Sequence, residues 1–286
     1  MILLEILVYG AVQSSVYALL AVGFALVFGV ARVVNLFHGS FYTLGAYVTY
    51  SLGVEAGFPM VLSILCGMAA AFLLGAVLDR YVVARVRDSM IKVLIVTLAL
   101  TLFFEQCVYH VFGPEHLNIP PLVGQRVTLL GVDIGGQRLL VLAVSVTVIA
   151  VLWFAVNRTR AGNALLATAQ NPEAAELMKI NTRRIFMVTT GLAGCMAALA
   201  GGIVSSFIMV YPKMGILPMI KAFTIVILGG LGSLGGSILA AVIIGYLETI
   251  VAFLISADIT DLVPLVAIFL TLVLRPNGLF GKRFKV

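Results

Sequence analysis

Charged residues are scarce in this sequence of 286 residues. Only 10% are Asp, Glu, Lys or Arg, whereas 62% are hydrophobic, and the mean hydropathy is +1.16. Soluble domains average about 25% charged and 45–50% apolar residues, so a water-soluble protein of this length is excluded. Apolar runs recur from residue 4 to residue 274 with no long polar segment between them. Residues 1–286 are therefore predicted to form a single transmembrane domain.

Cysteine and histidine are also rare. Cys66, Cys107 and Cys195 each stand alone in an apolar run, without the spacing of a metal site or a disulfide framework. His38 has no second histidine or carboxylate at metal-ligand spacing. The sequence also lacks a glycine-flanked serine nucleophile, a HExxH pair and closely spaced carboxylates. We predict that this chain holds no metal or cofactor and is not an enzyme.

The apolar runs predict an all-α integral membrane protein with about nine spans, within a range of eight to ten. The predicted spans are residues 4–30, 39–54, 59–78, 91–112, 139–157, 185–210, 216–231, 236–256 and 262–274. The second, seventh and ninth are short, which predicts tilted, broken or re-entrant helices. Asn35, His38 and Gly39 open the second span, and a glycine cluster closes the seventh.

Basic residues are distributed unevenly between the two sides that alternating spans define. One side holds Arg32, Arg80, Arg85, Arg87, Lys92, Arg158, Arg160, Lys179, Arg183, Arg184, Arg275, Lys282, Arg283 and Lys285, and the other holds Arg126, Arg138, Lys213 and Lys221. The first side is predicted to be cytoplasmic. The C-terminus then lies inside, the N-terminus outside, and residues 113–138 form the main external loop. The net charge is +6, and the basic residues lie in short loops between apolar runs. They therefore indicate contact with a lipid bilayer surface and no binding of nucleic acid.

The cytoplasmic loop of residues 157–185 is longer than an ordinary connector. Its alanine, leucine and glutamate content favours helix, and Pro172 with Glu173 suits a second helix that starts after Asn171. Short helices on the cytoplasmic face can transmit force from a soluble partner. The competing interpretation is a surface-lying segment with no partner.

Two carboxylates fall deep inside predicted spans. Glu105 stacks four residues after Thr101 and eight after Thr97, on one face of the fourth span, and Glu248 lies in the eighth. An intramembrane carboxylate is expensive and marks a translocation pathway or a structural bond to a neighbouring helix. Both interpretations stay open. Asn35, His38 and Gly39 are predicted to lie near the pathway because they interrupt a helix.

Gly230, Gly232 and Gly235 have the spacing G-x-G-x-x-G of a nucleotide-binding turn. That motif needs a preceding strand, whereas these glycines join two apolar runs. We therefore interpret them as a tight turn or a close approach between helices.

Four motifs resemble the branched-chain amino acid ABC transporter permease family. They are Asn35–Phe41 with Gly45-Ala46-Tyr47, the loop with Ala169-Gln170-Asn171, the glycine run Gly229–Gly236, and Leu274–Gly281. They occur in order over nearly the whole chain, and the chain resembles the shorter of the two permease subunits. Departures include Asn163 and Leu166, where the family often has arginines, and Lys179, where it often has glycine.

The resemblance implies a bacterial inner-membrane importer that moves branched-chain or other hydrophobic amino acids, or similar small acids, by alternating access. Expected partners are a homologous second permease, two cytoplasmic ATPases that use ATP and Mg, and an external (periplasmic) substrate-binding protein. By analogy, Ala169, Gln170, Asn171, Pro172 and Glu173 would contact the ATPases through a coupling helix. Two alternatives remain at this point: an ion-coupled secondary transporter or channel that uses Glu105 and Glu248, and a scaffold subunit.

Overall fold

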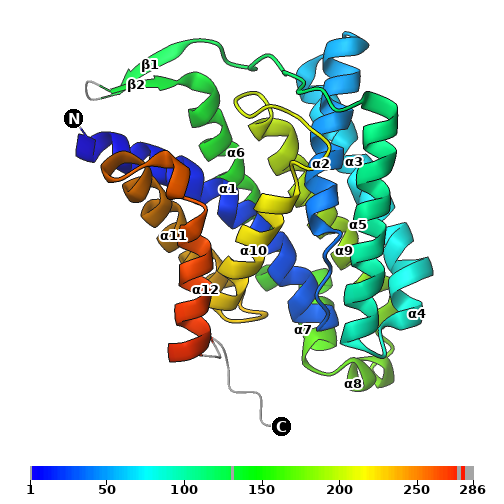
Figure 1. The fold of residues 1–286 in the computed structure, drawn as a ribbon. Coiled ribbons are helices and arrows are strands. Elements are labelled where there is room, and N and C mark those ends of the chain that lie inside the picture. Colours follow the sequence, from blue (N-terminus) through cyan, green and yellow to red (C-terminus); the bar gives the residue numbers. More distant parts are fainter. Residues whose placement is uncertain (1, 130–131, 276–277, 281–286) are drawn as a thin grey trace.

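The computed structural model describes residues 2–129, 132–275 and 278–280, and they are mostly helical (Figure 1). The long helices are α1 (Ile2–Ala31), α3 (Met60–Leu78), α5 (Met90–Phe112), α6 (Gly136–Arg158), α9 (Thr182–Val204) and α11 (Leu234–Leu254). The shorter ones are α2 (His38–Tyr50), α4 (Ala84–Val86), α7 (Arg160–Gln170), α8 (Pro172–Leu177), α10 (Ile216–Gly229) and α12 (Leu262–Leu274). Wider π-helical turns, Ser51–Glu55 and Asp79–Val83, follow α2 and α3, and a 3-10 turn, Ala257–Ile259, precedes α12.

Each predicted span coincides with a helix among the described residues. Six of these helices, α1, α3 with its extension to Val86, α5, α6, α9 and α11, are long and apolar enough to cross a membrane. The second, seventh and ninth spans are the short helices α2, α10 and α12, as expected. The sixth differs at its end, because α9 stops at Val204 although apolar residues continue to residue 210. The hydroxyls of Ser205 and Ser206 donate to the carbonyls of Gly202 and Ile203 there.

The external loop contains a structure that the sequence analysis did not predict. β1 (Arg126–Leu129) and β2 (Val132–Gly135) form an antiparallel hairpin, with Arg126 opposite Gly135 and Leu129 opposite Val132. The preceding stretch joins the helical body through backbone bonds between Leu117 and Val210. The hairpin and this stretch lie together at the upper end of Figure 1.

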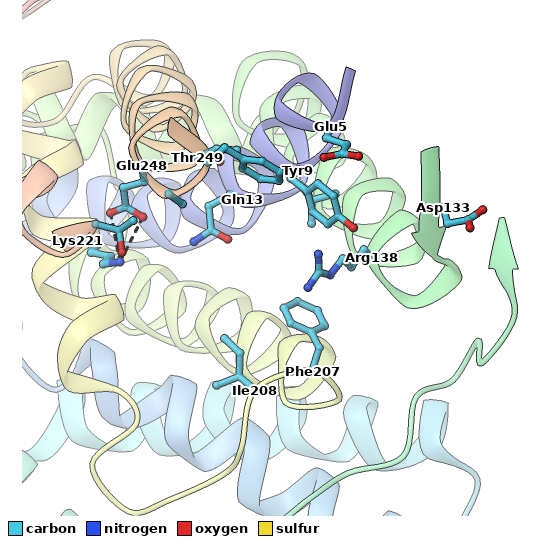
Figure 2. Close-up of a pocket in the computed structure, with 14 residues that line it drawn as sticks. Glu5, Tyr9, Gln13, Asp133, Arg138, Phe207, Ile208, Lys221, Glu248 and Thr249 are labelled. Atoms are coloured by element: carbon cyan, nitrogen blue, oxygen red, sulfur yellow. Dashed lines mark hydrogen bonds and ion pairs between the residues drawn. The ribbon is translucent and has the colours of Figure 1, made fainter. Parts of the chain in front are cut away.

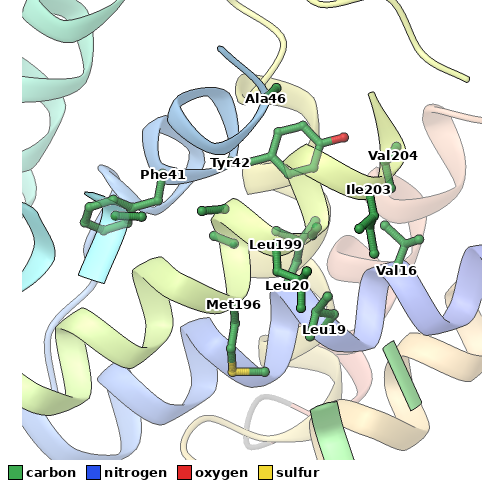
Figure 3. Close-up of a cluster of buried hydrophobic side chains, with 14 of the residues drawn as sticks. Val16, Leu19, Leu20, Phe41, Tyr42, Ala46, Met196, Leu199, Ile203 and Val204 are labelled. Carbon is green, nitrogen blue, oxygen red and sulfur yellow. The ribbon is translucent and has the colours of Figure 1, made fainter. Parts of the chain in front are cut away.

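Two helices form the centre of the molecule. The apolar window of α1 is 89% buried and that of α9 is 78% buried, against 17–39% for the other four long helices. Figure 3 shows side chains of α1, α2 and α9 meeting in the core, among them Leu19, Phe41 and Leu199. Because α1 and α9 contact protein nearly all round, they carry small and apolar residues on every face.

The same packing arrangement occurs twice, and each time it combines helices that come before α6–α8 in the sequence with helices that come after. α3 packs antiparallel along α9, where Gly75 meets Thr190 and Gly194 meets Ala71. In the second unit, α11 packs antiparallel along α1, where Gly245 meets Ser14. Each unit also contains one short helix that contacts both of its long helices. This is α2 in the unit of α3 and α9, and α10 in the unit of α11 and α1. The chain therefore builds one packing unit twice, around the crossing of α1 and α9.

Basic residues separate toward the two ends of the bundle. α4, α7 and α8 lie at the lower end of Figure 1, with Arg80, Arg85, Arg158 and Arg160 in or beside them. Lys282, Arg283 and Lys285, which the sequence analysis placed on the same side, lie outside the described residues.

Candidate functional site

A polar cavity of about 860 Å³ opens between α1, α10, α11 and the start of α6. It is lined by Glu5, Tyr9, Val12, Gln13, Asp133, Arg138, Phe207, Ile208, Lys221, Glu248, Thr249, Ala252, Phe253 and Thr260. Figure 2 shows Lys221 and Glu248 on one side of this space and Arg138 with Tyr9 on another. Charged groups of both signs therefore face one cavity, beside aromatic and aliphatic side chains.

A network of five side chains lies on one side of the cavity. Tyr17 donates from its hydroxyl to Glu248 Oε2, and Lys221 Nζ donates to Tyr17 Oη over 2.9 Å and to Glu248 Oε2 over 3.2 Å. Gln13 Nε2 donates to the same Tyr17 oxygen over 2.6 Å. Lys221 also lies 2.9 Å from Asp261 Oδ1. The network thus connects α1, α10, α11 and the residue before α12.

Lys221 and Glu248 compensate one another where either charge alone would be expensive to bury. The side chains of Lys221 and Glu248 are only 13% and 5% exposed. An unpaired charge at such a position costs several kcal/mol, whereas a paired and hydrogen-bonded one is tolerated. The pairing therefore fixes α10 and α11 relative to α1 at this level.

A narrower cavity of about 170 Å³ continues from the first. Gln13, Phe207, Ile208 and Lys221 line both spaces. The narrower one reaches Leu20, Tyr42, Val204, Tyr211, Met214 and Pro218, among others. A polar entrance thus leads to a mostly apolar interior between α1, α2 and α10.

The three helix-breaking residues lie together at the start of α2. Asn35 Oδ1 accepts from the amide of Phe37 over 3.0 Å. His38 Nε2 lies 3.1 Å from the carbonyl oxygen of Leu20, and since a carbonyl can only accept, this ring nitrogen carries the proton. A Cβ on Gly39 would lie 2.5 Å from the carbonyl oxygen of Gly215. All three are buried.

Of the five predicted pathway residues, the structure brings one to the cavities. Glu248 lines the wider cavity, and His38 bonds to Leu20, which lines the narrower one. Among the described residues, neither cavity lining includes Asn35, His38, Gly39 or Glu105. Glu105 is buried on α5.

The loop of residues 157–185 forms the two short helices α7 and α8. We call the exposed junction between them, residues 169–173, the elbow. Asn171 caps α8 by accepting from the amide of Ala174 over 3.1 Å, and Pro172 occupies its first turn. Gln170, Asn171, Pro172 and Glu173 are exposed, and Ala169 is half-buried. The helix predicted after Asn171 is therefore present.

The elbow is attached to the central helix α1. The Arg32 guanidinium, just after α1, donates to the carbonyl oxygens of Ala169 and Gln170 over 3.4 and 3.3 Å. Leu165 of α7 packs in a cluster with Leu26 and Val30 of α1. One face of α7 is thus held by the transmembrane bundle, and its far end presents the exposed elbow.

The glycine motif forms the turn between α10 and α11, as the sequence analysis proposed. Gly230 and Gly232 have positive φ angles of 98° and 84°, which glycine adopts without strain. Gly229 and Gly236 face one another so closely that a Cβ on Gly236 would collide with the carbonyl oxygen of Gly229. The helix α10, and not a strand, leads directly into the turn.

Most residues of the cavity were not predicted from the sequence. Lys221 was counted only as a basic residue of one side, and Tyr17, Gln13 and Arg138 were not singled out. Arg138 stacks over the ring of Tyr9 at 4.6 Å and near that of Phe207 at 5.7 Å. A lysine in the second turn of a short apolar helix was the available signal, since such a charge needs a partner.

Comparison with known proteins identifies the family. The family described as branched-chain amino acid transport system / permease component matches residues 6–272. This chain belongs to that family. The permease is 28% identical to the high-affinity branched-chain amino acid transport system permease protein LivH of Escherichia coli (strain K12), over 96% of this chain and 94% of LivH. It is 29% identical to the corresponding protein BraD of Pseudomonas aeruginosa, over 98% of this chain and 96% of BraD.

A solved structure supports the fold of this permease. PsaBC from Streptococcus pneumoniae in complex with Fab aligns with a TM-score of 0.53 at 12% identity, over 96% of this chain and 94% of that chain. At this identity the likeness concerns the fold alone. Together with the apolar helices, the family match shows a multi-pass membrane protein with a role in transport.

Proposed function

We propose that the chain is a permease subunit of an ATP-binding cassette importer that moves branched-chain or other hydrophobic amino acids, or similar small acids, inward. The observation that carries this proposal is the family match over residues 6–272. Relatives named as branched-chain amino acid permeases that cover nearly the whole chain support it. A polar entrance above an apolar cavity suits a zwitterion with an apolar side chain.

In the proposed assembly, the chain pairs with a homologous second permease. Two cytoplasmic ATPases bind ATP and Mg and contact the elbow of Ala169, Gln170, Asn171, Pro172 and Glu173. An external binding protein delivers the substrate at the end that carries the β-hairpin. Closure of the ATPases would press on the elbow, and α7 would pass this movement to α1 through Leu165 and Arg32. The chain itself performs no bond chemistry.

The proposed orientation places the elbow in the cytoplasm and the start of α1 outside. Support comes from the clustering of arginines at the end of the bundle that carries α4, α7 and α8. Cysteines introduced one at a time at the exposed positions Glu115 and Glu173 would test it with a membrane-impermeant thiol reagent on intact cells. The background for both variants has Cys66, Cys107 and Cys195 replaced by alanine. Labelling of the Glu115 variant alone is expected, and labelling of the Glu173 variant alone would reverse the orientation.

The ion-coupled alternative is weakened by the pairing of Glu248. A carboxylate that carries protons must lose and regain its charge, whereas Glu248 is bound to both Tyr17 and Lys221. Glu105 has no such pairing among the described residues and would be the better candidate for that mechanism.

The decisive experiment is purification of the chain co-expressed with its neighbouring genes, followed by ATP hydrolysis measurements in lipid vesicles. Substrate-loaded binding protein is expected to stimulate hydrolysis, with leucine, valine and aromatic acids tested in turn. Transport by the chain without any ATPase would instead establish the ion-coupled mechanism.

A further inference from the structure

Arginines from three segments surround two adjacent hollows where α3 ends and α9 begins. The first hollow, of about 450 Å³, is lined by Arg80, Ala84, Arg85, Arg87, Glu176, Thr182, Arg183 and Phe186. The second, of about 420 Å³, is lined by Arg80, Asn181, Arg183, Arg184 and Met187. Arg80 and Arg183 are common to both. We call the two hollows the arginine pocket.

Arg87 is a fixed part of the pocket wall. Its Nη2 lies 2.6 Å from Asp79 Oδ1, which also accepts from the hydroxyl of Thr190 over 3.2 Å. The guanidinium stacks over the ring of Phe186 at 3.9 Å from the centroid. The buried Asp79 offsets the charge of Arg87. Arg87 therefore holds the pocket wall in place and contributes little to attracting an anion.

Arg80, Arg85 and Arg183 differ from Arg87 in being exposed. Within residues 2–129, 132–275 and 278–280, none of the three forms an ion pair with a carboxylate. Glu176 is the one carboxylate in the pocket lining, and its Oε1 is engaged by the hydroxyl of Thr182. The pocket therefore keeps an excess of positive charge and several guanidinium donors directed at a concave space.

An exposed apolar stripe runs along α3 and ends beside Arg80, which lines the pocket. Leu73 and Val77 are 63% and 49% exposed, and Tyr81 follows four residues later at 49%. The guanidinium of Arg80 lies 5.5 Å from the Tyr81 ring centroid. An apolar helix face that ends in a tyrosine and arginines is typical of the depth at which lipid tails give way to headgroups.

We propose that the arginine pocket binds the phosphate of an anionic phospholipid, whose acyl chains lie along the exposed stripe of α3. The excess of arginines matches a phosphate, and the adjoining stripe matches acyl chains. An acidic protein surface would satisfy the arginines but would leave Leu73 and Val77 uncovered. The proposal is independent of which molecule the permease transports.

The test uses the full-length chain, purified in detergent and freed of native lipid. Native mass spectrometry and thermal unfolding are measured with phosphatidylglycerol, with phosphatidylcholine and with inorganic phosphate. Wild type is compared with R80Q/R183Q, with the charge-retaining R80K/R183K, and with R158Q/R160Q, which removes two exposed arginines from the same end of the bundle outside the pocket.

Phosphatidylglycerol is expected to bind wild type and to raise its unfolding temperature more than phosphatidylcholine or phosphate does. R80Q/R183Q should bind it roughly 25-fold more weakly, at about fivefold for each arginine near the membrane surface. R80K/R183K should retain most of the binding, and R158Q/R160Q should match wild type.

Three results would overturn the proposal. Equal binding of phosphatidylcholine would show that headgroup charge is not recognised, and an equal effect of inorganic phosphate would indicate a soluble anion as ligand. Unchanged lipid binding by R80Q/R183Q, together with lost co-purification of the ATPases, would assign the arginines to a protein contact. The R80K/R183K variant separates a folding defect from a loss of charge.

Discussion

Lys221 of α10 and Glu248 of α11 form an ion pair at 3.2 Å in a region where both side chains are nearly enclosed by protein. Tyr17 of α1 bonds to both of them. The consecutive helices α10 and α11, and α1 from the other end of the sequence, therefore meet at one buried charge pair beside the cavity.

Substitution of one partner is expected to destabilise the permease strongly. E248Q leaves Lys221 with only Asp261 as a carboxylate partner, and K221M leaves Glu248 as an uncompensated buried charge. Each change should cost about 3–5 kcal/mol of unfolding free energy, because a buried charge loses its partner. Thermal unfolding in detergent, with uptake in cells alongside, measures the effect.

The double variant K221M/E248Q provides the control, since it removes both charges together. Its loss of stability is expected to be smaller than the sum of the two single losses. A stable E248Q protein that has lost transport would contradict this structural role and would favour a proton pathway through Glu248.

The exposed elbow is expected to be required for uptake but not for insertion. Gln170 and Glu173 project from the bundle, so Q170A/E173A should leave the fold intact. Uptake should fall to background, because the ATPases lose their contact. Asn171 is left unchanged, since its loss as an N-cap would cost about 1 kcal/mol by itself.

The measurements are membrane yield, uptake and the amount of ATPase that co-purifies. Q125A/E115A exchanges the same two residue types on exposed positions at the opposite end and should leave ATPase co-purification unchanged. Normal uptake by Q170A/E173A would remove the coupling role from this elbow.

Two neighbouring glycines of α11 are expected to respond differently to alanine. G236A places a Cβ against the Gly229 carbonyl oxygen and should cost about 1–3 kcal/mol, as overpacked sites do. No atom lies within 4 Å of a Cβ built on Gly235, so G235A should leave the unfolding temperature unchanged or raise it slightly. Equal effects of both substitutions on thermal unfolding would disprove the close approach of α10 and α11.

Gln137 is expected to hold the external loop against the bundle. Its Oε1 accepts from the amides of Leu122 and Val123 over 3.0 and 3.4 Å, and its Nε2 donates to the Ile203 carbonyl over 3.1 Å. Q137A leaves these groups unpaired, at about 1–3 kcal/mol for each buried one. Limited proteolysis should cut residues 113–125 faster than in wild type.

Q137M keeps most of the side-chain volume but supplies neither the acceptor for the two loop amides nor the donor to Ile203. It should therefore leave the loop as open to cleavage as Q137A does. Identical cleavage rates for wild type and Q137A would show that other contacts hold the loop.

Helix positions could be predicted from the sequence because a bilayer imposes a length on every apolar run. The short second, seventh and ninth spans also appear as short helices, since His38 and the glycine turn fix where α2 begins and α10 ends. The early end of α9 at Val204 could not be predicted, because apolar residues continue past it. The hairpin of β1 and β2 is too short to leave a periodic signal.

The cavity was largely beyond prediction, for a different reason. Helical spacing shows which residues of one helix share a face, but not which helix that face meets. Glu248 was recognised as an unusual buried carboxylate, yet its partners Tyr17 and Lys221 lie 231 and 27 positions away. Only the packing of α11 against α1 and α10 brings them together.

The helix α1 runs unbroken for 30 residues, from Ile2 to Ala31. Glu5 and Tyr9 near its start lie at the cavity entrance, and its end lies beside Arg32 and the elbow. At about 1.5 Å per residue it is roughly 45 Å long and has no proline at which it could bend. A tilt imposed at the elbow is therefore expected to move the cavity end of α1 as well. The states of the two ends of the protein would then be coupled through this one helix.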